Sequence, residues 1–397
     1  MRMTESDELL TVRIDKIVAG GDGLGRDERI PIDERAKAIF IPFVLPGERV
    51  RVRVTEQRAD FDRAELVEVL EASPARVEAP CRLYGACGGC NFQHMSYDEQ
   101  LRQKLLIVSD AFRRIASIKL ETLSMVPGKP LHYRNRVQLH RDSNGALGFR
   151  SRNGAETVPV ESCPIAHPSI NQFLDNVRTG IQTTPPAERF TVIGTDAGTE
   201  VAGQHQQQTL TILGRNVSFM PEAFFQSNLA MVDELIPWVV DGLEGDTAAD
   251  LYAGVGVFSM FLTERYGTVH VVEENAAACK CAKDNLSATA AKATGNFVVH
   301  PLRVEQWLSR DYRGRRLDAV IVDPPRAGLS KVVRTELISR RVPEIRYVSC
   351  NPVTLARDAS AFKSAGYRLG SCTLFDFYPN TAHIEAFLSF TWEGPGR

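Results

Sequence analysis

The chain has 397 residues, of which 43% are hydrophobic and 24% are charged, and its formal net charge is −2. This composition is typical of a globular protein, and the length predicts two or three domains. No apolar run approaches the roughly 20 residues that span a bilayer, and the N-terminus MRMTESDELL lacks the apolar core of a signal peptide. We therefore expect a cytoplasmic protein without membrane contact. The near-neutral charge does not indicate a nucleic-acid binder, although a local basic surface remains compatible with it.

The first zone, residues 1–75, predicts a small β-barrel. Val50, Val52 and Val54 alternate with Arg51 and Arg53, which is the pattern of a strand with one apolar and one basic face. Short strands separated by glycine turns indicate a barrel of the OB type, and such barrels often bind nucleic acid. The arginines can equally form an ordinary solvated face.

The second zone, residues 76–225, holds a group of cysteines, a helix expected at about 97–118 and an arginine-rich stretch. In HYRNRVQLH, Arg134 and Arg136 lie near a tyrosine and have few acids nearby. Arginines mixed with aromatic residues suit phosphate contacts and base stacking. A solvated basic sheet face is the alternative.

The third zone, residues 226–397, alternates strands with helical patterns. DLYAGVGVFSMFL is typical of a strand, a glycine turn and a helix, and further strands are expected at VHVVEEN, NFVVH, LDAVIVDPP and IRYVSCNP. This alternation predicts a parallel sheet with helices on both faces. Such sheets bind ligands at the carboxyl ends of their strands, where the unusual residues of this zone fall.

Two of these strand ends indicate a nucleoside ligand. Gly254 and Gly256 allow close approach to the backbone, and Glu273 can accept hydrogen bonds from ribose hydroxyls. A dinucleotide site would usually have glycine where Ser259 stands. The pattern therefore favours a nucleoside without phosphates, such as S-adenosylmethionine.

Asp323 ends the next strand and is followed by two prolines and Arg326. The prolines prevent the strand from continuing, so a rigid turn with a helix-capping aspartate is one interpretation. An amino-directed methyltransferase would have an aromatic residue in place of Arg326, which argues against that class.

Cys350 and Glu385 are the two candidate catalytic residues. Cys350 lies between a strand and the start of a helix, and a helix N-terminus lowers the pKa of a thiol. Glu385 lies in an otherwise apolar strand, where it is either paired or serves as a base with a raised pKa. A thiolate can add to carbon 6 of uracil and activate carbon 5 toward a methyl donor, after which a base removes the carbon 5 proton. A buried structural cysteine is the alternative.

These motifs resemble the RNA 5-methyluridine methyltransferases, most of all the members with a TRAM domain and an iron–sulfur cluster that act on 23S rRNA. The segments FFQSN, DLYAGVGVFS, DPPRAGL, SCNP and HIEAF occur in the family order across nearly the whole chain. The resemblance implies that Cys350 is the nucleophile and Glu385 the proton acceptor. It also implies contacts to S-adenosylmethionine from Gln226, Tyr252, Glu273 and Asp323.

The resemblance extends to the other two zones. It implies that residues 1–75 form a TRAM-like barrel, that residues 76–225 form a β-rich RNA-binding domain, and that the helix at about 97–118 packs on the catalytic domain, residues 226–397. Four cysteines could equally bind zinc, because their spacing alone does not distinguish zinc from an iron–sulfur cluster. The resemblance implies a 4Fe–4S cluster. The implied ligands are Cys81, Cys87, Cys90 and Cys163.

The sequence departs from the family at Val257, where asparagine is common, and in HPLRVEQ, which lacks a clear adenine contact. We expect a monomer that methylates 23S rRNA. The alternatives are methylation of the tRNA T-loop, and a non-catalytic RNA-binding factor, against which the intact pair Cys350 and Glu385 argues.

Overall fold

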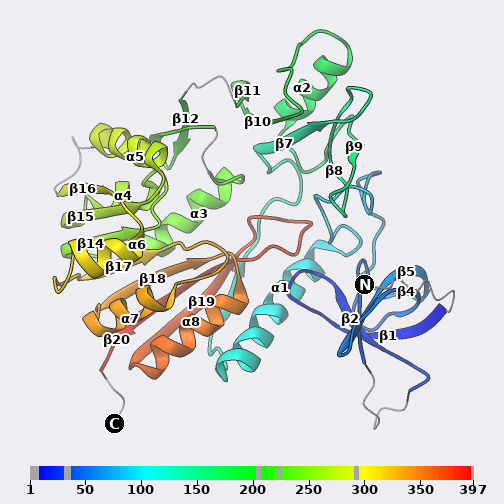
Figure 1. Ribbon diagram of the computed structural model, residues 1–397, viewed down its shortest axis with the longest axis horizontal. Helices are drawn as coiled ribbons and strands as arrows, with labels where there is room; N and C mark the ends of the chain where they lie inside the picture. The colour runs from blue at the N-terminus through cyan, green and yellow to red at the C-terminus, as the bar shows by residue number, and fades with distance from the viewer. Residues whose placement is uncertain (1–8, 31–36, 203–206, 222–224, 290–294, 395–397) are drawn as a thin grey trace. The chain divides into compact units, whose positions relative to one another are not determined.

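The computed structural model describes residues 9–30, 37–202, 207–221, 225–289 and 295–394 (Figure 1). The chain forms two compact units, and each is assembled from separate stretches. The first unit comprises Met1–Ile107, His140–Pro164 and Tyr378–His383. The second comprises Val108–Leu139, Ile165–Phe377 and Ile384–Arg397. The expected division into residues 1–75, 76–225 and 226–397 stays a prediction.

A closed barrel of five strands forms the N-terminal part of the first unit, as expected. In the order around the barrel its strands are β1 (Leu9–Ile17), β2 (Gly23–Asp27), β3 (Ala38–Ile41), β5 (Phe61–Glu71) and β4 (Arg49–Gln57). Val50 and Val52 are fully buried in the barrel core, whereas Arg51 and Arg53 lie on the outer face. The alternation in the sequence therefore corresponds to the two faces of β4.

The outer arginines of β4 are paired with acids of β5. Arg51 Nη1 lies 2.7 Å from Glu68 Oε2, and Arg53 Nη1 lies 2.9 Å from Glu65 Oε1. Cross-strand pairs of opposite charge stabilise neighbouring strands by a few tenths of a kcal/mol to about 1 kcal/mol. The basic face expected from the sequence is therefore neutralised at these positions by glutamates.

Helical and strand segments follow the barrel. The expected helix at about 97–118 consists of α1 (Tyr97–Ala111) and the π-helical turn η1 (Phe112–Ala116). Within the second unit, η1 packs against α8 (Pro352–Ser364). The other elements before the large sheet are β7 (Arg136–Arg141), β8 (Leu147–Arg150), β9 (Thr157–Pro159), α2 (Pro168–Arg178), β10 (Arg189–Thr195), β11 (Gly198–Val201), β12 (Gln208–Ile212) and β13 (Arg215–Phe219).

An eight-stranded sheet is the centre of the second unit (Figure 1). Its strands in spatial order are β16 (Asn296–Pro301), β15 (Tyr266–Glu273), β14 (Gly245–Leu251), β17 (Ala319–Val322), β18 (Glu344–Ser349), β20 (Glu385–Trp392), β19 (Tyr367–Phe375) and β6 (Leu123–Val126). The first five are parallel, and β20 runs antiparallel to both of its neighbours. The α/β fold with a parallel sheet and an antiparallel end is therefore confirmed.

Helices connect the strands of this sheet. They are α3 (Leu229–Val240), α4 (Val257–Leu262), α5 (Ala276–Thr289), α6 (Val304–Gln306), η2 (Trp307–Asp311), α7 (Lys331–Arg340) and α8. The four residues of β17, Ala-Val-Ile-Val, are all buried, as is typical of a strand covered on both faces. Among the residues that the structure describes, no helix combines the length and the apolar character needed to cross a membrane.

Candidate active site

Four neighbouring parallel strands bring the predicted site residues to one edge of the sheet. The strands β15, β14, β17 and β18 lie side by side, and their carboxyl ends carry or precede Glu273, Tyr252, Asp323 and Cys350. The chain runs from β14 outward to β15 and β16, and then continues on the other side of β14 with β17. Ligands of open α/β sheets bind at the carboxyl edge beside such a reversal of strand order.

The turn between β14 and α4 is shaped by residues with positive φ. Tyr252 has a φ of 64°, and its backbone N–H donates to Val272 O at 3.0 Å. Gly254 has a φ of 56°, and a Cβ atom added there would meet no atom within 4 Å. The Gly254 N–H donates to Glu273 Oε2 at 3.0 Å. Open space beside Gly254, bordered by the Glu273 carboxylate, suits a hydroxylated ligand that approaches the backbone closely.

Asp250 belongs to this site, although it was not singled out from the sequence. It is fully buried in β14, and its Oδ2 accepts hydrogen bonds from the Ser259 N–H at 3.1 Å and the Ser259 hydroxyl at 2.6 Å. Its Oδ1 has no hydrogen-bond partner in the described part of the chain. Burial raises the pKa of Asp250 to about 7. An aspartate in the apolar run of a central strand was the available signal, and Ser259 is its partner.

Asp323 follows β17 at the centre of the same edge. Its N–H points to Leu251 O, at an N–O distance of 3.4 Å, before Pro324 and Pro325 end the strand pairing. Desolvation raises the pKa of the Asp323 carboxyl, and the charge of Asp250 raises it further. The two aspartates therefore favour a state in which at least one of them holds a proton.

Cys350 and Glu385 are brought together by an antiparallel strand pair. Cys350 follows directly after β18, and Ser349 of β18 is paired with Ala386 of β20. Glu385, the first residue of β20, is only 3% exposed. Asn351 begins α8 as its N-cap, with Oδ1 accepting from the Val353 N–H at 3.0 Å. The register places the thiol and the carboxylate, which are 35 residues apart in the sequence, at the same end of two paired strands.

The surroundings of Cys350 raise the pKa of its thiol to about 11. Burial is the main cause, the charges of Glu385 and Asp323 add to it, and the charge of Arg326 lowers the pKa. The expectation that the helix N-terminus lowers this pKa is therefore wrong in direction, because burial and two carboxylates outweigh it. Burial also raises the pKa of Glu385 well above its ordinary value, with Asp323 as the second cause. A carboxylate with a raised pKa is a stronger base.

The other residues predicted to contact ligands lie in the second unit. Gln226 is half-buried just before Asn228, the N-cap of α3. Arg134 donates through Nε to Arg136 O at 3.1 Å, and Arg136 donates through Nη2 to Pro221 O at 2.9 Å. Arg326 is exposed. Arg134 and Arg136 are thus each held by a hydrogen bond to a backbone carbonyl.

The four cysteines predicted as cluster ligands all lie in the first unit and are half-buried; they are Cys81, Cys87, Cys90 and Cys163. The Gly89 N–H donates to Cys87 Sγ at 3.4 Å. Thiolates are the usual ligands of iron–sulfur clusters, so the residue types fit. The arrangement does not show such a site, because the described residues contain no group of three or more His, Cys, Asp or Glu placed to hold a metal ion.

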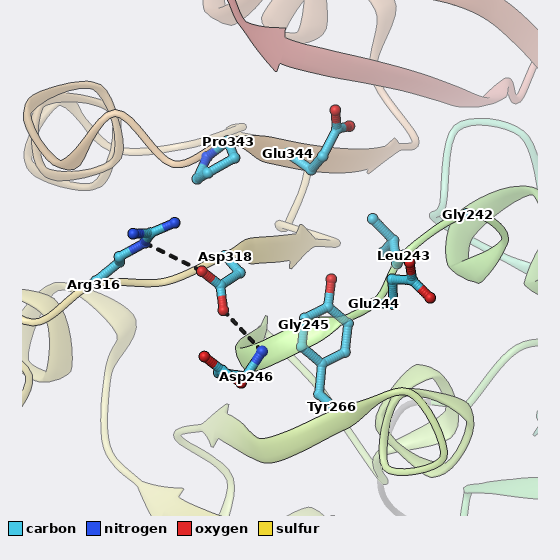
Figure 2. Close-up of a pocket in the computed structure, with 10 residues that line it drawn as sticks. All are labelled: Gly242, Leu243, Glu244, Gly245, Asp246, Tyr266, Arg316, Asp318, Pro343 and Glu344. Atoms are coloured by element: carbon cyan, nitrogen blue, oxygen red, sulfur yellow. Dashed lines mark hydrogen bonds and ion pairs between the residues drawn. The ribbon is translucent and has the colours of Figure 1, made fainter.

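A hollow of about 370 Å³ lies at the opposite, amino-terminal edge of the large sheet. Figure 2 shows its lining, with the side chains of Tyr266, Asp318 and Glu344 from or beside the starts of β15, β17 and β18. Asp318 Oδ2 accepts from the Asp246 N–H at 3.0 Å, and Arg316 Nε lies 3.2 Å from Asp318 Oδ1. None of the predicted site residues lines this hollow, so it is separate from the candidate active site.

The fold at this edge is that of a methyltransferase. The structure superposes on the crystal structure of a Pyrococcus abyssi tRNA (uracil-54, C5)-methyltransferase with a TM-score of 0.73, over 96% of this chain and 100% of that chain, at 22% identity. Sequence models of the tRNA (uracil-5-)-methyltransferase family and of the TRAM domain match residues 186–391 and 8–67, respectively. The chain thus belongs to the tRNA (uracil-5-)-methyltransferase family, whose members are RNA uracil-5-methyltransferases, and it carries an N-terminal TRAM domain.

Relatives match nearly the full length of the chain. An uncharacterized RNA methyltransferase of Treponema denticola is 30% identical, over 88% of this chain and 92% of the relative. A 23S rRNA (uracil(1939)-C(5))-methyltransferase of Pectobacterium atrosepticum is 27% identical, over 96% of this chain and 93% of the relative. The resemblance read from the sequence motifs is confirmed.

Proposed function

We propose that this protein methylates carbon 5 of a uridine in 23S rRNA, with S-adenosylmethionine as methyl donor and Cys350 as a covalent nucleophile. The observation that supports the proposal is the pairing of Ser349 in β18 with Ala386 in β20, since Cys350 and the buried Glu385 are their neighbours at the same end of the two strands. Several relatives named as 23S rRNA uracil methyltransferases support the choice of RNA.

The donor would occupy the carboxyl edge of β14, β15 and β17. When bound, S-adenosylmethionine supplies an electrophilic methyl group. Glu273 would accept hydrogen bonds from the ribose hydroxyls, and the open space at Gly254 would admit the ligand beside the backbone. We assign Tyr252, Gly256, Gln226 and Asp323 to the same site as further donor contacts.

Cys350 and Glu385 would carry out the chemistry on the uracil ring. The Cys350 thiol loses its proton to solvent, the thiolate sulfur adds to carbon 6, and the electron pair of the 5,6 double bond becomes available at carbon 5. Carbon 5 would take up the methyl group as the bond between the methyl carbon and the donor's sulfur breaks, which leaves S-adenosylhomocysteine, and carbon 5 would then carry both a methyl group and a proton. Glu385 accepts that proton, the 5,6 double bond reforms, and the bond between sulfur and carbon 6 breaks. The raised pKa of Glu385 suits it to this role as proton acceptor.

Arg134, Arg136 and Arg326 are proposed RNA contacts. Arg134 and Arg136 donate to backbone carbonyls, and these bonds do not neutralise the positive charge that phosphate groups would meet. We also propose the three consecutive domains expected from the sequence and a monomeric enzyme.

We keep Cys81, Cys87, Cys90 and Cys163 as the proposed ligands of a 4Fe–4S cluster with no part in the methylation steps. Chemical determination of iron, acid-labile sulfide and zinc in protein purified without oxygen tests this assignment. Four iron and four sulfide per chain would support it, whereas zinc without iron would contradict it.

The first test of the function is nucleoside mass spectrometry of separated rRNA and tRNA from cells with and without the gene. Loss of 5-methyluridine from 23S rRNA is the expected result. Loss from tRNA alone would support uracil methylation and show that tRNA, not 23S rRNA, is the substrate. No loss in either RNA would favour a non-catalytic RNA-binding role. RNA containing 5-fluorouridine tests the mechanism, because fluorine at carbon 5 leaves no proton for Glu385 to remove and the covalent adduct should accumulate.

A further inference from the structure

The turn that follows Asp323 is bound to the beginning of α8 through its backbone carbonyls. Arg326 O accepts a hydrogen bond from Asn351 Nδ2 at 2.8 Å and another from the Thr354 hydroxyl at 3.3 Å. Arg357 Nη2 donates to Ala327 O at 3.1 Å and to Leu329 O at 2.9 Å. Since α8 begins directly after Cys350, these bonds tie the turn to the segment that carries the thiol. We call residues 324–329 the proline turn.

Asp358 is the centre of this attachment. It is fully buried, and Oδ2 accepts from the Leu329 N–H of the proline turn at 2.9 Å and from the Tyr347 hydroxyl of β18 at 2.8 Å. Its Oδ1 accepts from Arg334 Nη1 and from Arg357 Nε, each at 2.8 Å. One carboxylate thus joins the proline turn, β18, α7 and α8. A buried carboxylate satisfied by four donors fixes its partners, since removal of any one leaves a buried oxygen with an unsatisfied hydrogen-bonding site.

Gly328 shows how closely the proline turn lies on the helix. Its φ is 71°, and a Cβ atom added there would come within 2.8 Å of Arg357 Nη2, Asp358 Oδ2 and Thr354 Cβ. Only glycine fits this contact without displacing the network.

The attachment of the proline turn to α8 affects the charge near the Cys350 thiol. The proline turn carries Arg326, whose positive charge acts on Cys350 and opposes the negative charges of Glu385 and Asp323. The three groups come from different elements: Arg326 from the proline turn, Glu385 from β20, and Asp323 from the end of β17. The position of the cation relative to the sulfur therefore depends on where the proline turn is held.

We propose that Asp358 and Arg357 are positioning residues that hold the proline turn on α8 and thereby fix where the Arg326 charge lies relative to the Cys350 thiol. The proposal rests on the proposed role of Cys350 as the nucleophile and adds two residues that act on it through Arg326. Asp358 and Arg357 themselves touch neither the thiol nor a substrate in this scheme.

The test is the pH dependence of Cys350 alkylation by iodoacetamide, followed on the Cys350 peptide by mass spectrometry. Full-length wild type, Arg326→Gln, Arg357→Gln and the double variant are compared. We expect each single substitution to lower the alkylation rate about tenfold on the rising limb of the profile. The thiolate fraction there falls tenfold when the pKa of the thiol rises by about one. The double variant should be no slower than Arg326→Gln, because both changes remove the same charge effect.

Arg340→Gln is the matched control. Arg340 Nη1 donates to Tyr312 O and Arg315 O, and Nη2 donates to Leu308 O, so it also binds backbone carbonyls but not those of the proline turn. This variant should lose stability and keep the wild-type alkylation profile. Asp358→Asn should lower the alkylation rate to the same extent as Arg357→Gln, and Arg357→Gln keeps the test valid if the buried substitution prevents folding.

An unchanged profile in Arg357→Gln or in Arg326→Gln would overturn the proposal, and so would additive effects in the double variant. The assay contains neither RNA nor methyl donor. A protein that alkylates as expected but methylates no RNA would therefore contradict the proposed function and leave the positioning role intact.

Discussion

The acids on the barrel surface and the acids at the carboxyl edge of the large sheet are in opposite situations. On the barrel, Glu65 and Glu68 are about half exposed and lie within 3 Å of arginines of β4. At the sheet edge, Asp250 and Glu385 are buried, and no cation is among the influences on either pKa in the part of the chain that the structure describes.

This difference shows that burial and neighbouring charges determine how readily a carboxyl group ionises. An exposed acid beside an arginine remains ionised and contributes little to stability, because water screens the pair. A buried acid without a counter-charge resists ionisation, and burial accordingly raises the pKa of Asp250 to about 7 and that of Glu385 well above its ordinary value. A carboxyl group with a raised pKa is a stronger base once it is ionised, which suits a proton acceptor.

The largest effect should follow from removal of the thiol. We expect Cys350→Ala to lower RNA methylation by roughly 10⁶-fold, the scale seen when a covalent nucleophile is removed. Transfer of a radiolabelled methyl group to RNA measures this. Residual activity within about tenfold of wild type would exclude the covalent mechanism.

Glu385→Gln should lower turnover by roughly 10²–10⁴-fold, the usual contribution of a general base. Because the glutamine cannot take the carbon 5 proton, the protein–RNA adduct should persist on a denaturing gel. Glu344→Gln, at the opposite end of β18, is the control and should keep wild-type turnover. Full turnover in Glu385→Gln would assign the proton acceptor to another group.

Asp250→Asn should change how stability depends on pH. In the folded protein the pKa of Asp250 is about 7, above its ordinary value of 3.8. Between these two values the unfolded chain gives up the proton and the folded chain keeps it, so the wild type loses stability as the pH rises. The wild type should therefore lose up to a few kcal/mol relative to Asp250→Asn between low pH and neutral pH. Urea unfolding at several pH values measures the difference, and parallel curves for the two proteins would contradict it.

Methylation should accelerate with rising pH. Since the pKa of the Cys350 thiol is about 11, only a small fraction is thiolate near neutral pH. That fraction rises about tenfold per pH unit until the pH approaches the pKa. Single-turnover rates with saturating RNA and donor should follow this rise, and a rate independent of pH would show that thiol ionisation does not limit the reaction.

The smallest effect is expected on the barrel surface. Arg51→Gln should change the free energy of unfolding by about 0.2–1 kcal/mol, because the pair with Glu68 is exposed. Chemical unfolding of the full chain measures this change. A much larger loss would show that the pair is part of a coupled network.

Much of the fold could be predicted from the sequence because the patterns are local. The alternation of Val50 and Val52 with Arg51 marked the two faces of β4, and the alternation of strands with helical patterns marked the parallel sheet. Cys350 and Glu385 were predicted from residue type and from motifs. The glutamate partners of the β4 arginines could not be predicted, because they come from β5 through strand pairing.

The sequence by itself determined the α/β class, the barrel, the family and the candidate catalytic residues, since each depends on short patterns or motifs. The tertiary structure decided the surroundings of those residues. Asp250 became part of the site through its burial, and the pKa of Cys350 moved upward because β20 and the end of β17 bring carboxylates close to it. Electrostatic effects of this kind depend on distance and burial, which side chains acquire only when strands remote in the sequence pair in a defined register.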